Sequence, residues 1–276
     1  GAKLPAHVLS IEAPGIARAK LIDATPIGIN VRSTVATYAN VHDELRKLYA
    51  KTPDAKRLGF KAGDFSYNTG RLRCPVCDGT GVIGLDVQFL PDVDIPCPAC
   101  RGSRYAKDAA LVKAQHPGGQ AYSLPEVMAM DIDTALAACA DWGLVCQRLG
   151  VLQSLALGYL TLGEATPSLS GGEAQRLKLA SEMGRGQEDS VFVFDEPTLG
   201  LHPLDVQTLV RVFQTLIDNG ATVIVIEHDL DVMRSADYII DMGPGGGEAG
   251  GRVVAAGTPE EIAQNGQSIT GRYLAK

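Results

Sequence analysis

The chain has 276 residues, of which 45% are hydrophobic and 21% are charged, and it carries a formal net charge of −7. This balance is ordinary for a globular protein and excludes an extensively disordered chain. Because no run approaches the roughly 18–20 consecutive apolar residues of a membrane-spanning helix, and no secretory signal pattern is present, we expect a soluble cytoplasmic protein without a membrane contact.

Charge is unevenly distributed along the sequence. Residues 1–107 carry a formal charge of +5, whereas residues 108–276 carry −12. A basic stretch within an acidic protein suits a local surface for a polyanion such as a nucleic acid. From charge alone, a solvated charged face is the simpler interpretation.

Residues 66–107 form a small module that contains four of the six cysteines. They are arranged as two Cys-x-x-Cys pairs separated by 19 residues: Cys74, Cys77, Cys97 and Cys100. This spacing predicts one tetrahedral Zn²⁺ site, which is structural because four thiolates leave no open position. The segment Val82–Asp94 between the pairs is predicted to form a hairpin. Disulfides and free buried thiols are the alternatives, and the lack of a secretory context disfavours disulfides.

Basic side chains surround this module: Arg71, Arg73, Arg101, Arg104 and Lys107. Guanidinium and ammonium groups gathered in this way can contact the phosphates of a nucleic acid. The same residues can equally form a solvated charged surface, so both interpretations stay open.

A helical region rich in Leu, Ala and Val is expected at about 124–158, and the most specific string in the chain, Leu169–Arg176, follows it. The residues that open a predicted helix over 170–183 are Ser170, Gly171, Gly172 and Glu173. The free N–H groups and the positive dipole end of such a helix suit a bound phosphate. Ser170 with Glu173 is also a capping box, which explains those two residues without a ligand.

From Val191 onward the sequence alternates between strand and helix patterns. The predicted elements, in chain order, are strand Val191–Phe194, helix Pro203–Asp218, strand Thr222–Ile226, helix Leu230–Ser235, strand Tyr238–Met242 and strand Arg252–Ala256. The apolar runs of the first two strands indicate a parallel sheet that is buried on both faces. The fold class is therefore α/β.

Acidic and imidazole side chains follow two of these strands. Asp195 and Glu196 end the first strand, at the edge where α/β sheets place their ligands. Asp195 is expected to help hold Mg²⁺, and Glu196 to polarise an attacking water. His228, after the second strand, can reach a γ-phosphate, although a lone histidine at a strand end is more often structural. The order and spacing of the eight-residue string Leu169–Arg176, the acidic pair and the histidine favour a nucleotide site.

The three motifs resemble those of ABC-type ATPases: a signature motif at Leu169–Arg176, a Walker B motif at Val191–Glu196 and a switch histidine at His228. More closely, the chain resembles the UvrA family. The segments that carry this closer match are Pro26–Gly28, Ala36–Tyr38, Phe65–Asn68, Phe89–Asp92, Leu169–Arg176, Asp195–His202 and Ile226–Val232.

The resemblance implies a partial ABC-type ATPase domain, mainly a parallel sheet with helices, that carries an inserted helical signature domain bearing the zinc module. The implied division is a remnant of the ATP-binding core at 1–30, the signature domain at 31–185 with its zinc module at about 66–107, and the remaining ATP-binding core at 186–276.

The UvrA resemblance also implies a function. Members of the family are ATP-driven sensors of damaged double-stranded DNA in nucleotide excision repair, and as excinuclease subunits they form a UvrA dimer and load UvrB. ATP and Mg²⁺ are then cofactors of the full-length protein, bound between motifs of opposing halves. The implied nucleotide contacts are Ser170, Gly171, Gly172, Glu173 and Asp195, and the implied catalytic residues are Glu196 and His228.

Two departures from the family pattern affect the expected activity. No Gly-x-x-x-x-Gly-Lys-Ser/Thr phosphate loop (Walker A) occurs, and even the dipeptide Gly-Lys is absent. We therefore expect a cut fragment from the second, C-terminal nucleotide-binding half, without ATPase activity by itself. Ala24 stands at the position of the family's Q-loop glutamine, which keeps open a divergent UvrA-like paralogue of the antibiotic self-resistance type. A DnaJ-like zinc chaperone module, suggested by Cys74–Gly81, is the third alternative. Such a module would not explain the string Leu169–Arg176.

Overall fold

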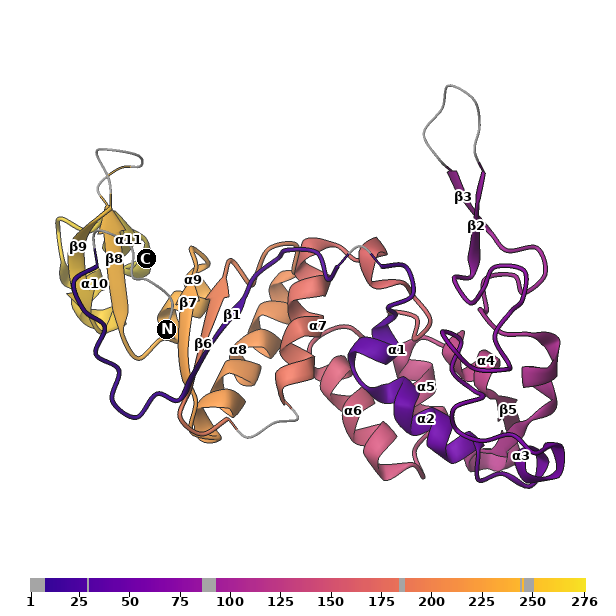
Figure 1. The fold of residues 1–276 in the computed structure, drawn as a ribbon. Coiled ribbons are helices and arrows are strands. Elements are labelled where there is room, and N and C mark those ends of the chain that lie inside the picture. Colours follow the sequence, from indigo (N-terminus) through magenta and orange to yellow (C-terminus); the bar gives the residue numbers. More distant parts are fainter. Residues whose placement is uncertain (1–7, 29, 86–92, 184–186, 244, 246–250) are drawn as a thin grey trace. The chain divides into compact units, whose positions relative to one another are not determined.

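The computed structural model describes residues 8–28, 30–85, 93–183, 187–243, 245 and 251–276, and its ribbon is drawn in Figure 1. The chain forms two compact units, residues 1–23 with 185–276 and residues 24–184. The first division falls before the expected boundary after residue 30, because Ala24 already lies against Gly171 and Thr25 accepts a 2.8 Å hydrogen bond from Lys178 Nζ. The expected boundary at 185/186 lies outside the described residues.

The first unit contains a parallel sheet in the order β1-β6-β7, built from β1 (Arg18–Ile22), β6 (Ser190–Asp195) and β7 (Thr222–Ile226). Helix α8 (Pro203–Asp218) joins β6 to β7, and α9 (Leu230–Arg234) follows β7. The predicted strands and helices of this region are confirmed, and so is the parallel pairing.

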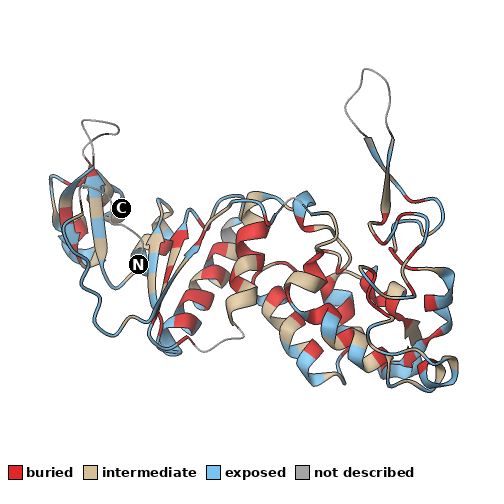
Figure 2. Ribbon diagram, viewed as in Figure 1, coloured by how far each residue is buried: buried red, intermediate tan, exposed pale blue. Residues whose placement is uncertain are grey.

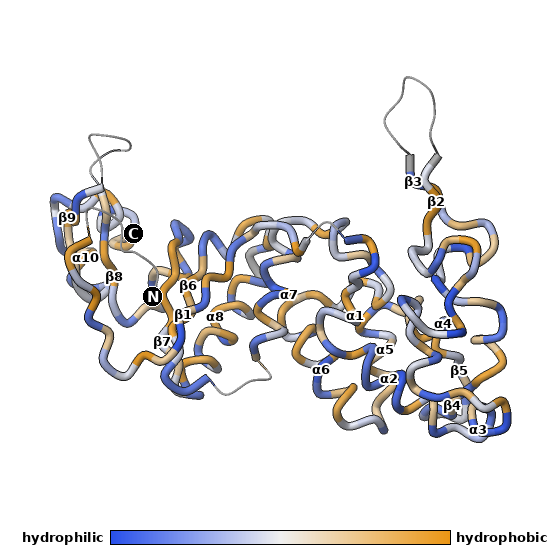
Figure 3. Tube along the Cα trace, viewed as in Figure 1, coloured by the Kyte–Doolittle hydropathy of each residue, from blue (hydrophilic) through white to orange (hydrophobic). Residues whose placement is uncertain are grey.

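One face of this sheet is packed and the other is open to solvent. On the packed face Phe192 and Phe194 are buried, and the ring centroid of Phe194 lies 4.8 Å from that of Phe213 in α8. On the opposite face Leu21 and Ile224 are 62% and 49% exposed. Strand β7 is hydrophobic in Figure 3 but exposed or intermediate in Figure 2. The prediction that both faces are buried is wrong for the described residues, because an apolar strand sequence does not report whether a second layer covers it.

Two further strands, β8 (Ile239–Gly243) and β9 (Arg252–Gly257), pair antiparallel in a separate sheet. Helices α10 (Pro259–Gln264) and α11 (Ile269–Leu274) follow them. Each of these helices has an N-terminal side-chain cap: the hydroxyl of Thr258 accepts the N–H of Glu261, and the hydroxyl of Ser268 accepts the N–H of Gly271.

The second unit is mainly helical. Its α-helices are α1 (Val35–Tyr38), α2 (Val41–Tyr49), α3 (Pro53–Leu58), α4 (Leu124–Met128), α5 (Ile132–Ala138), α6 (Gly143–Ser154) and α7 (Gly171–Met183). Short 3₁₀ turns cover Lys107–Leu111, Pro117–Gly119 and Thr166–Ser168. The predicted helical region at 124–158 is confirmed as three helices. Within the described part of the chain, no helix combines the length and the apolar character that crossing a bilayer requires.

This unit also contains two antiparallel hairpins, one formed by β2 (Val82–Leu85) with β3 (Val93–Pro96) and one by β4 (Lys113–Gln115) with β5 (Ala121–Ser123). The first confirms the predicted hairpin between the two cysteine pairs. The residues that connect its strands, which include the motif Phe89–Asp92, lie outside the described residues.

Candidate metal centre and candidate nucleotide site

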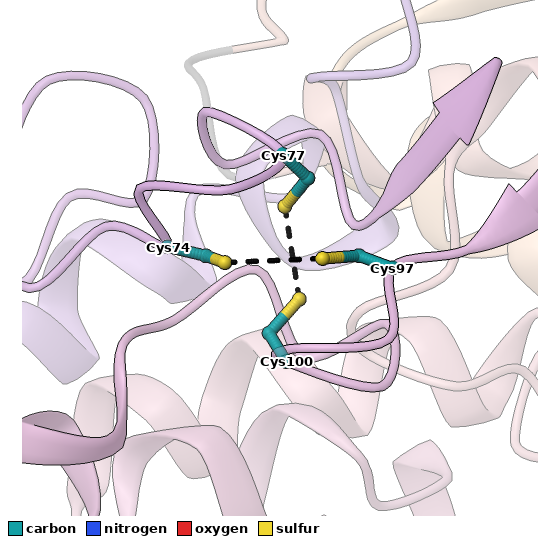
Figure 4. Close-up of side chains that lie close together, drawn as sticks. All are labelled: Cys74, Cys77, Cys97 and Cys100. Atoms are coloured by element: carbon teal, nitrogen blue, oxygen red, sulfur yellow. Dashed lines mark hydrogen bonds between the residues drawn. The ribbon is translucent and has the colours of Figure 1, made fainter.

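Four thiols of the cysteine module converge on one point (Figure 4). Their Sγ atoms all lie within 4.8 Å of one another, with 4.0 Å between Cys74 and Cys97 and 3.7 Å between Cys77 and Cys100. All four are free rather than disulfide-bonded. Sulfur ligands at about 2.3 Å from a tetrahedral Zn²⁺ ion lie about 3.8 Å from one another, so the observed spacing fits such an ion.

The surroundings of Cys77 favour a thiolate, which is the form that binds a metal. Burial opposes ionisation of this thiol, but the N–H of Gly81, which donates to Cys77 Sγ at 3.3 Å, and the neighbouring thiols of Cys100 and Cys74 outweigh burial. Together they lower the pKa of Cys77 to about 7. A lower thiol pKa reduces the proton release that must accompany metal binding at neutral pH.

The two Cys-x-x-Cys turns share one backbone conformation. After the second cysteine of each pair, two consecutive residues have left-handed φ angles, 51° and 78° at Asp78 and Gly79 and 52° and 86° at Arg101 and Gly102. In each turn the N–H three residues after that cysteine donates back to the cysteine carbonyl oxygen, at 3.0 Å and 3.1 Å. Two turns of the same shape therefore present two pairs of sulfur atoms to one point, as Figure 4 shows.

Arg104 serves the interior of this module rather than its surface. Arg104 is only 6% exposed. Its Nη1 donates to the carbonyl oxygens of Val31 at 2.8 Å and Gly79 at 3.4 Å, and its Cζ lies 5.3 Å from the ring centroid of Tyr67. The prediction that Arg104 belongs to a phosphate-contacting surface is wrong, because a guanidinium enclosed by carbonyl oxygens and a ring is not accessible to a ligand.

The other four basic residues lie at the surface or near it. Arg71 and Arg73 each pair with an aspartate, at 3.1 Å and 2.9 Å, and Arg101 and Lys107 are exposed. Ion pairs on the surface are weak and can be exchanged for a phosphate. These four side chains therefore remain candidates for contact with a polyanion.

Strands β6 and β7 bring the predicted catalytic residues to one edge of the sheet. Asp195 pairs in register with Ile226, so the residues after each strand leave the sheet at adjacent points. Glu196 has a φ of 46°, and its N–H donates to the carbonyl oxygen of Ile226 at 2.9 Å. Asp195, Glu196 and His228 are all exposed there. Two carboxylates and one imidazole are thus presented at the carboxyl ends of parallel strands, which is the usual ligand position in α/β sheets.

Sequence reasoning missed Glu227, which lies directly between the strand and His228. Its side chain is 2% exposed, and its carboxylate accepts hydrogen bonds from Thr198 and from the N–H groups of His228 and Asp229. Burial raises the pKa of Glu227, but these hydrogen bonds outweigh burial and hold the pKa below its usual range. An acid before a histidine at a strand end is a weak signal, so the sequence alone could not single it out.

The signature residues belong to the helical unit, whereas Asp195, Glu196 and His228 belong to the sheet unit. Ser170 donates to Glu173 Oε2 through its N–H at 2.7 Å and its Oγ at 2.8 Å, which is the predicted capping box. The other oxygen of Glu173 accepts from the hydroxyl of Tyr159 at 2.6 Å. Both donors of Ser170 at the start of α7 are therefore engaged by a carboxylate of the same helix.

Comparison with known proteins gives close relatives but no match to a protein-family model. UvrABC system protein A of Aquifex aeolicus is 46% identical over 92% of this chain and 27% of that protein, and the Bacillus subtilis protein of the same name is 46% identical over 92% and 26%. The crystal structure of UvrA2 from Deinococcus radiodurans aligns with a TM-score of 0.87 and 44% identity, covering 96% of this chain and 32% of that one. The chain thus spans about a quarter of the length of the curated relatives it matches.

Proposed function

The chain belongs to the UvrA family, and on this premise we propose that it forms the second nucleotide-binding half of a UvrA-type ATPase that recognises damaged DNA in nucleotide excision repair. The observation that carries the proposal is the 46% identity over 92% of the chain, which extends far beyond the short motifs.

The exposed residues at the strand ends support a role in nucleotide hydrolysis. Asp195 would help to hold Mg²⁺, Glu196 would orient and polarise the attacking water, and His228 would contact the γ-phosphate of ATP. The signature residues 170–173 would contact a nucleotide that is held mainly by an opposing half. For that contact Ser170 must exchange the carboxylate it now binds for a phosphate.

The cysteine cluster supports a structural Zn²⁺ ion in a module that contacts DNA. Four thiolates would fill the tetrahedron, so the ion would hold the two turns together and take no part in chemistry. The cations at or near the surface of the module, Arg71, Arg73, Arg101 and Lys107, would bind phosphates. Metal analysis of the purified chain should find about one Zn²⁺ per chain, and a folded chain without metal would overturn this part of the proposal.

The family also supports the partners and the compartment. A UvrA-type protein would act in the cytoplasm, form a dimer with a second UvrA copy, bind damaged double-stranded DNA and load UvrB. In this proposal both units have a role: nucleotide binding between opposing halves would alter how the cysteine modules contact the DNA.

Genetic complementation tests the proposal. The complete gene product, expressed in a bacterium that lacks UvrA, should restore survival after ultraviolet irradiation, and its Glu196→Gln variant should not, because the attacking water loses its polarising carboxylate. A stably expressed wild-type protein that gives no protection would overturn the repair role.

One observation favours a second candidate, a divergent UvrA-like paralogue that serves antibiotic self-resistance. Ala24 replaces the Q-loop glutamine, and its Cβ lies 3.2 Å from the place that a Cβ on Gly171 would occupy. The signature turn therefore packs against a side chain that cannot contact a metal ion. Under this alternative, the complete gene product would protect against a DNA-binding antibiotic and would not protect against ultraviolet light.

A further inference from the structure

We infer that Glu227 is a positioning residue that holds the loop after β6 and the loop after β7 in one fixed geometry. The inference rests on the proposed nucleotide function, because these two loops carry Glu196 and His228, and the first of them begins directly after Asp195, the last residue of β6. It assigns a role to a side chain that touches none of the reacting atoms itself.

The two oxygens of the Glu227 carboxylate serve different loops. Oε1 accepts both donors of Thr198, its N–H at 2.9 Å and its hydroxyl, in the loop that follows β6. Oε2 accepts the N–H of His228 at 2.7 Å and the N–H of Asp229 at 3.0 Å, in the loop that follows β7. One buried carboxylate therefore joins the two chain segments through four hydrogen bonds.

Neighbouring contacts stiffen both ends of this connection. The N–H of Glu196 donates to the carbonyl oxygen of Ile226 at 2.9 Å, and the N–H of Leu199 donates back to the carbonyl oxygen of Glu196 at 3.1 Å. On the other loop, Asp229 caps α9 by accepting the N–H groups of Asp231 at 2.9 Å and Val232 at 3.2 Å.

The position of His228 depends on the backbone more than on its own contacts. Its side chain is 80% exposed, and its Nδ1 lies 3.8 Å from Glu227 Oε2. A side chain that is held so loosely takes its position from the peptide groups on either side of it. Glu227 fixes those groups, since it binds the N–H of His228 and of the next residue.

The chemistry of the four donors requires a carboxylate at position 227. A glutamine has one accepting oxygen, and its NH₂ group would face a pair of N–H or O–H donors. An aspartate is one methylene shorter and cannot reach both loops from the same backbone position. Replacing the buried acceptor therefore leaves donors unsatisfied, which loosens the loops instead of simply removing a contact.

Hydrogen exchange on the chain itself tests the structural part without any nucleotide. In Glu227→Gln, the amides of Thr198, His228 and Asp229 should exchange at least about tenfold faster than in the wild type, while those of Asp231 and Val232 keep their cap. Glu260→Gln, an exposed glutamate on α10, is the matched control and should change none of these rates. Unchanged exchange at all three amides in Glu227→Gln would overturn the inference.

Steady-state ATP hydrolysis by the complete gene product tests the functional part. Glu227→Gln should lower kcat by about 10- to 100-fold with a much smaller change in KM, because loop misplacement affects the reacting geometry more than ground-state binding. Thr198→Val removes only the hydroxyl donor and should show a smaller loss in kcat, whereas Thr198→Ser keeps both donors and should restore the wild-type value. If Glu227→Gln fails to fold, the two Thr198 variants still test the connection, because they change it from the side of the other partner.

The two experiments separate this inference from the proposed function. A wild-type protein that hydrolyses no ATP removes the proposed function, and the exchange rates then decide alone whether Glu227 joins the loops. Faster exchange in Glu227→Gln with unchanged kcat would contradict a positioning role in an active ATPase. A loss of kcat in Thr198→Val that Thr198→Ser restores supports that role.

Discussion

Gly79 and Gly102 are equivalent residues of the two cysteine turns, yet their surroundings differ. Both have left-handed φ angles, 78° and 86°. A Cβ added at Gly79 would lie 1.8 Å from the carbonyl oxygen of Tyr67, whereas a Cβ at Gly102 would meet no described heavy atom within 4 Å. The two positions share a conformational requirement, and only Gly79 also has a steric one.

Alanine substitution should separate these requirements. Gly102→Ala should lower the free energy of unfolding by about 1–2 kcal/mol, the cost of a left-handed alanine. Gly79→Ala should cost more than about 3 kcal/mol, because the backbone of Tyr67 must also move. Urea unfolding of both variants in the presence of Zn²⁺ measures the difference, and equal losses would contradict the proposed steric role of the Tyr67 carbonyl.

His42 is a buried imidazole whose hydrogen-bond partners fix which ring nitrogen carries the hydrogen. Its Nε2 lies 2.7 Å from the hydroxyl oxygen of Tyr105, whose own hydrogen is donated to the carbonyl oxygen of Phe65 at 2.9 Å. The hydrogen between His42 and Tyr105 is therefore the one on Nε2. Burial, followed by the positive charges of Arg46 and Arg104, lowers the pKa of His42 to about 3.

This shift predicts a loss of stability in acid. The unfolded chain binds a proton at an ordinary histidine pKa of about 6.5, so between pH 6.5 and about 3 it binds more protons at this residue than the folded chain. The free energy of unfolding should therefore decrease with falling pH, by up to about 1.4 kcal/mol per unit from His42. His42→Gln should lose this contribution, and unfolding curves of both proteins at several pH values isolate it. The same pH slope in both would contradict the assignment.

At the scale of elements, the basic cluster around the cysteine turns divides into surface and interior residues. Arg101→Gln and Lys107→Gln, tested in the complete gene product, should each weaken binding to duplex DNA and reduce the slope of log K against log salt by about 1, with unchanged stability. Arg104→Gln should instead lower thermal stability, because it leaves two carbonyl oxygens and the Tyr67 ring without their partner. Fluorescence anisotropy at several salt concentrations and thermal unfolding measure these effects. If only Arg104→Gln changed the salt slope, the assignment of Arg101 and Lys107 to the DNA-contacting surface and of Arg104 to the interior would be contradicted.

Local sequence specified the elements but not their surroundings. The strand β6, the helix α8 and the capped start of α7 could be predicted, because apolar runs, helical periodicity and a Ser-x-x-Glu box act within one segment. The convergence of four thiols could also be predicted, since a tetrahedral ion requires it. The burial of Arg104 and the four hydrogen bonds of Glu227 could not, because their partners lie in other segments of the chain.

For the whole molecule, the missing phosphate-binding loop determines the expected catalytic behaviour. The chain alone should release no phosphate from ATP above background, because it has no Gly-Lys-Ser/Thr sequence to hold the β- and γ-phosphates. A phosphate-release assay with Mg²⁺, run beside Glu196→Gln of the same chain, checks this. Turnover by the wild-type chain that Glu196→Gln abolishes would contradict the prediction.

The open face of the parallel sheet affects how the chain behaves in solution. Leu21, Ile224 and Ile226, which share that face by register, are 62%, 49% and 55% exposed. An exposed apolar patch on a sheet face promotes self-association, and charge elsewhere on the molecule does not shield it at physiological ionic strength. We therefore expect these side chains of β1 and β7 to contribute to self-association of the isolated chain despite its net charge of −7.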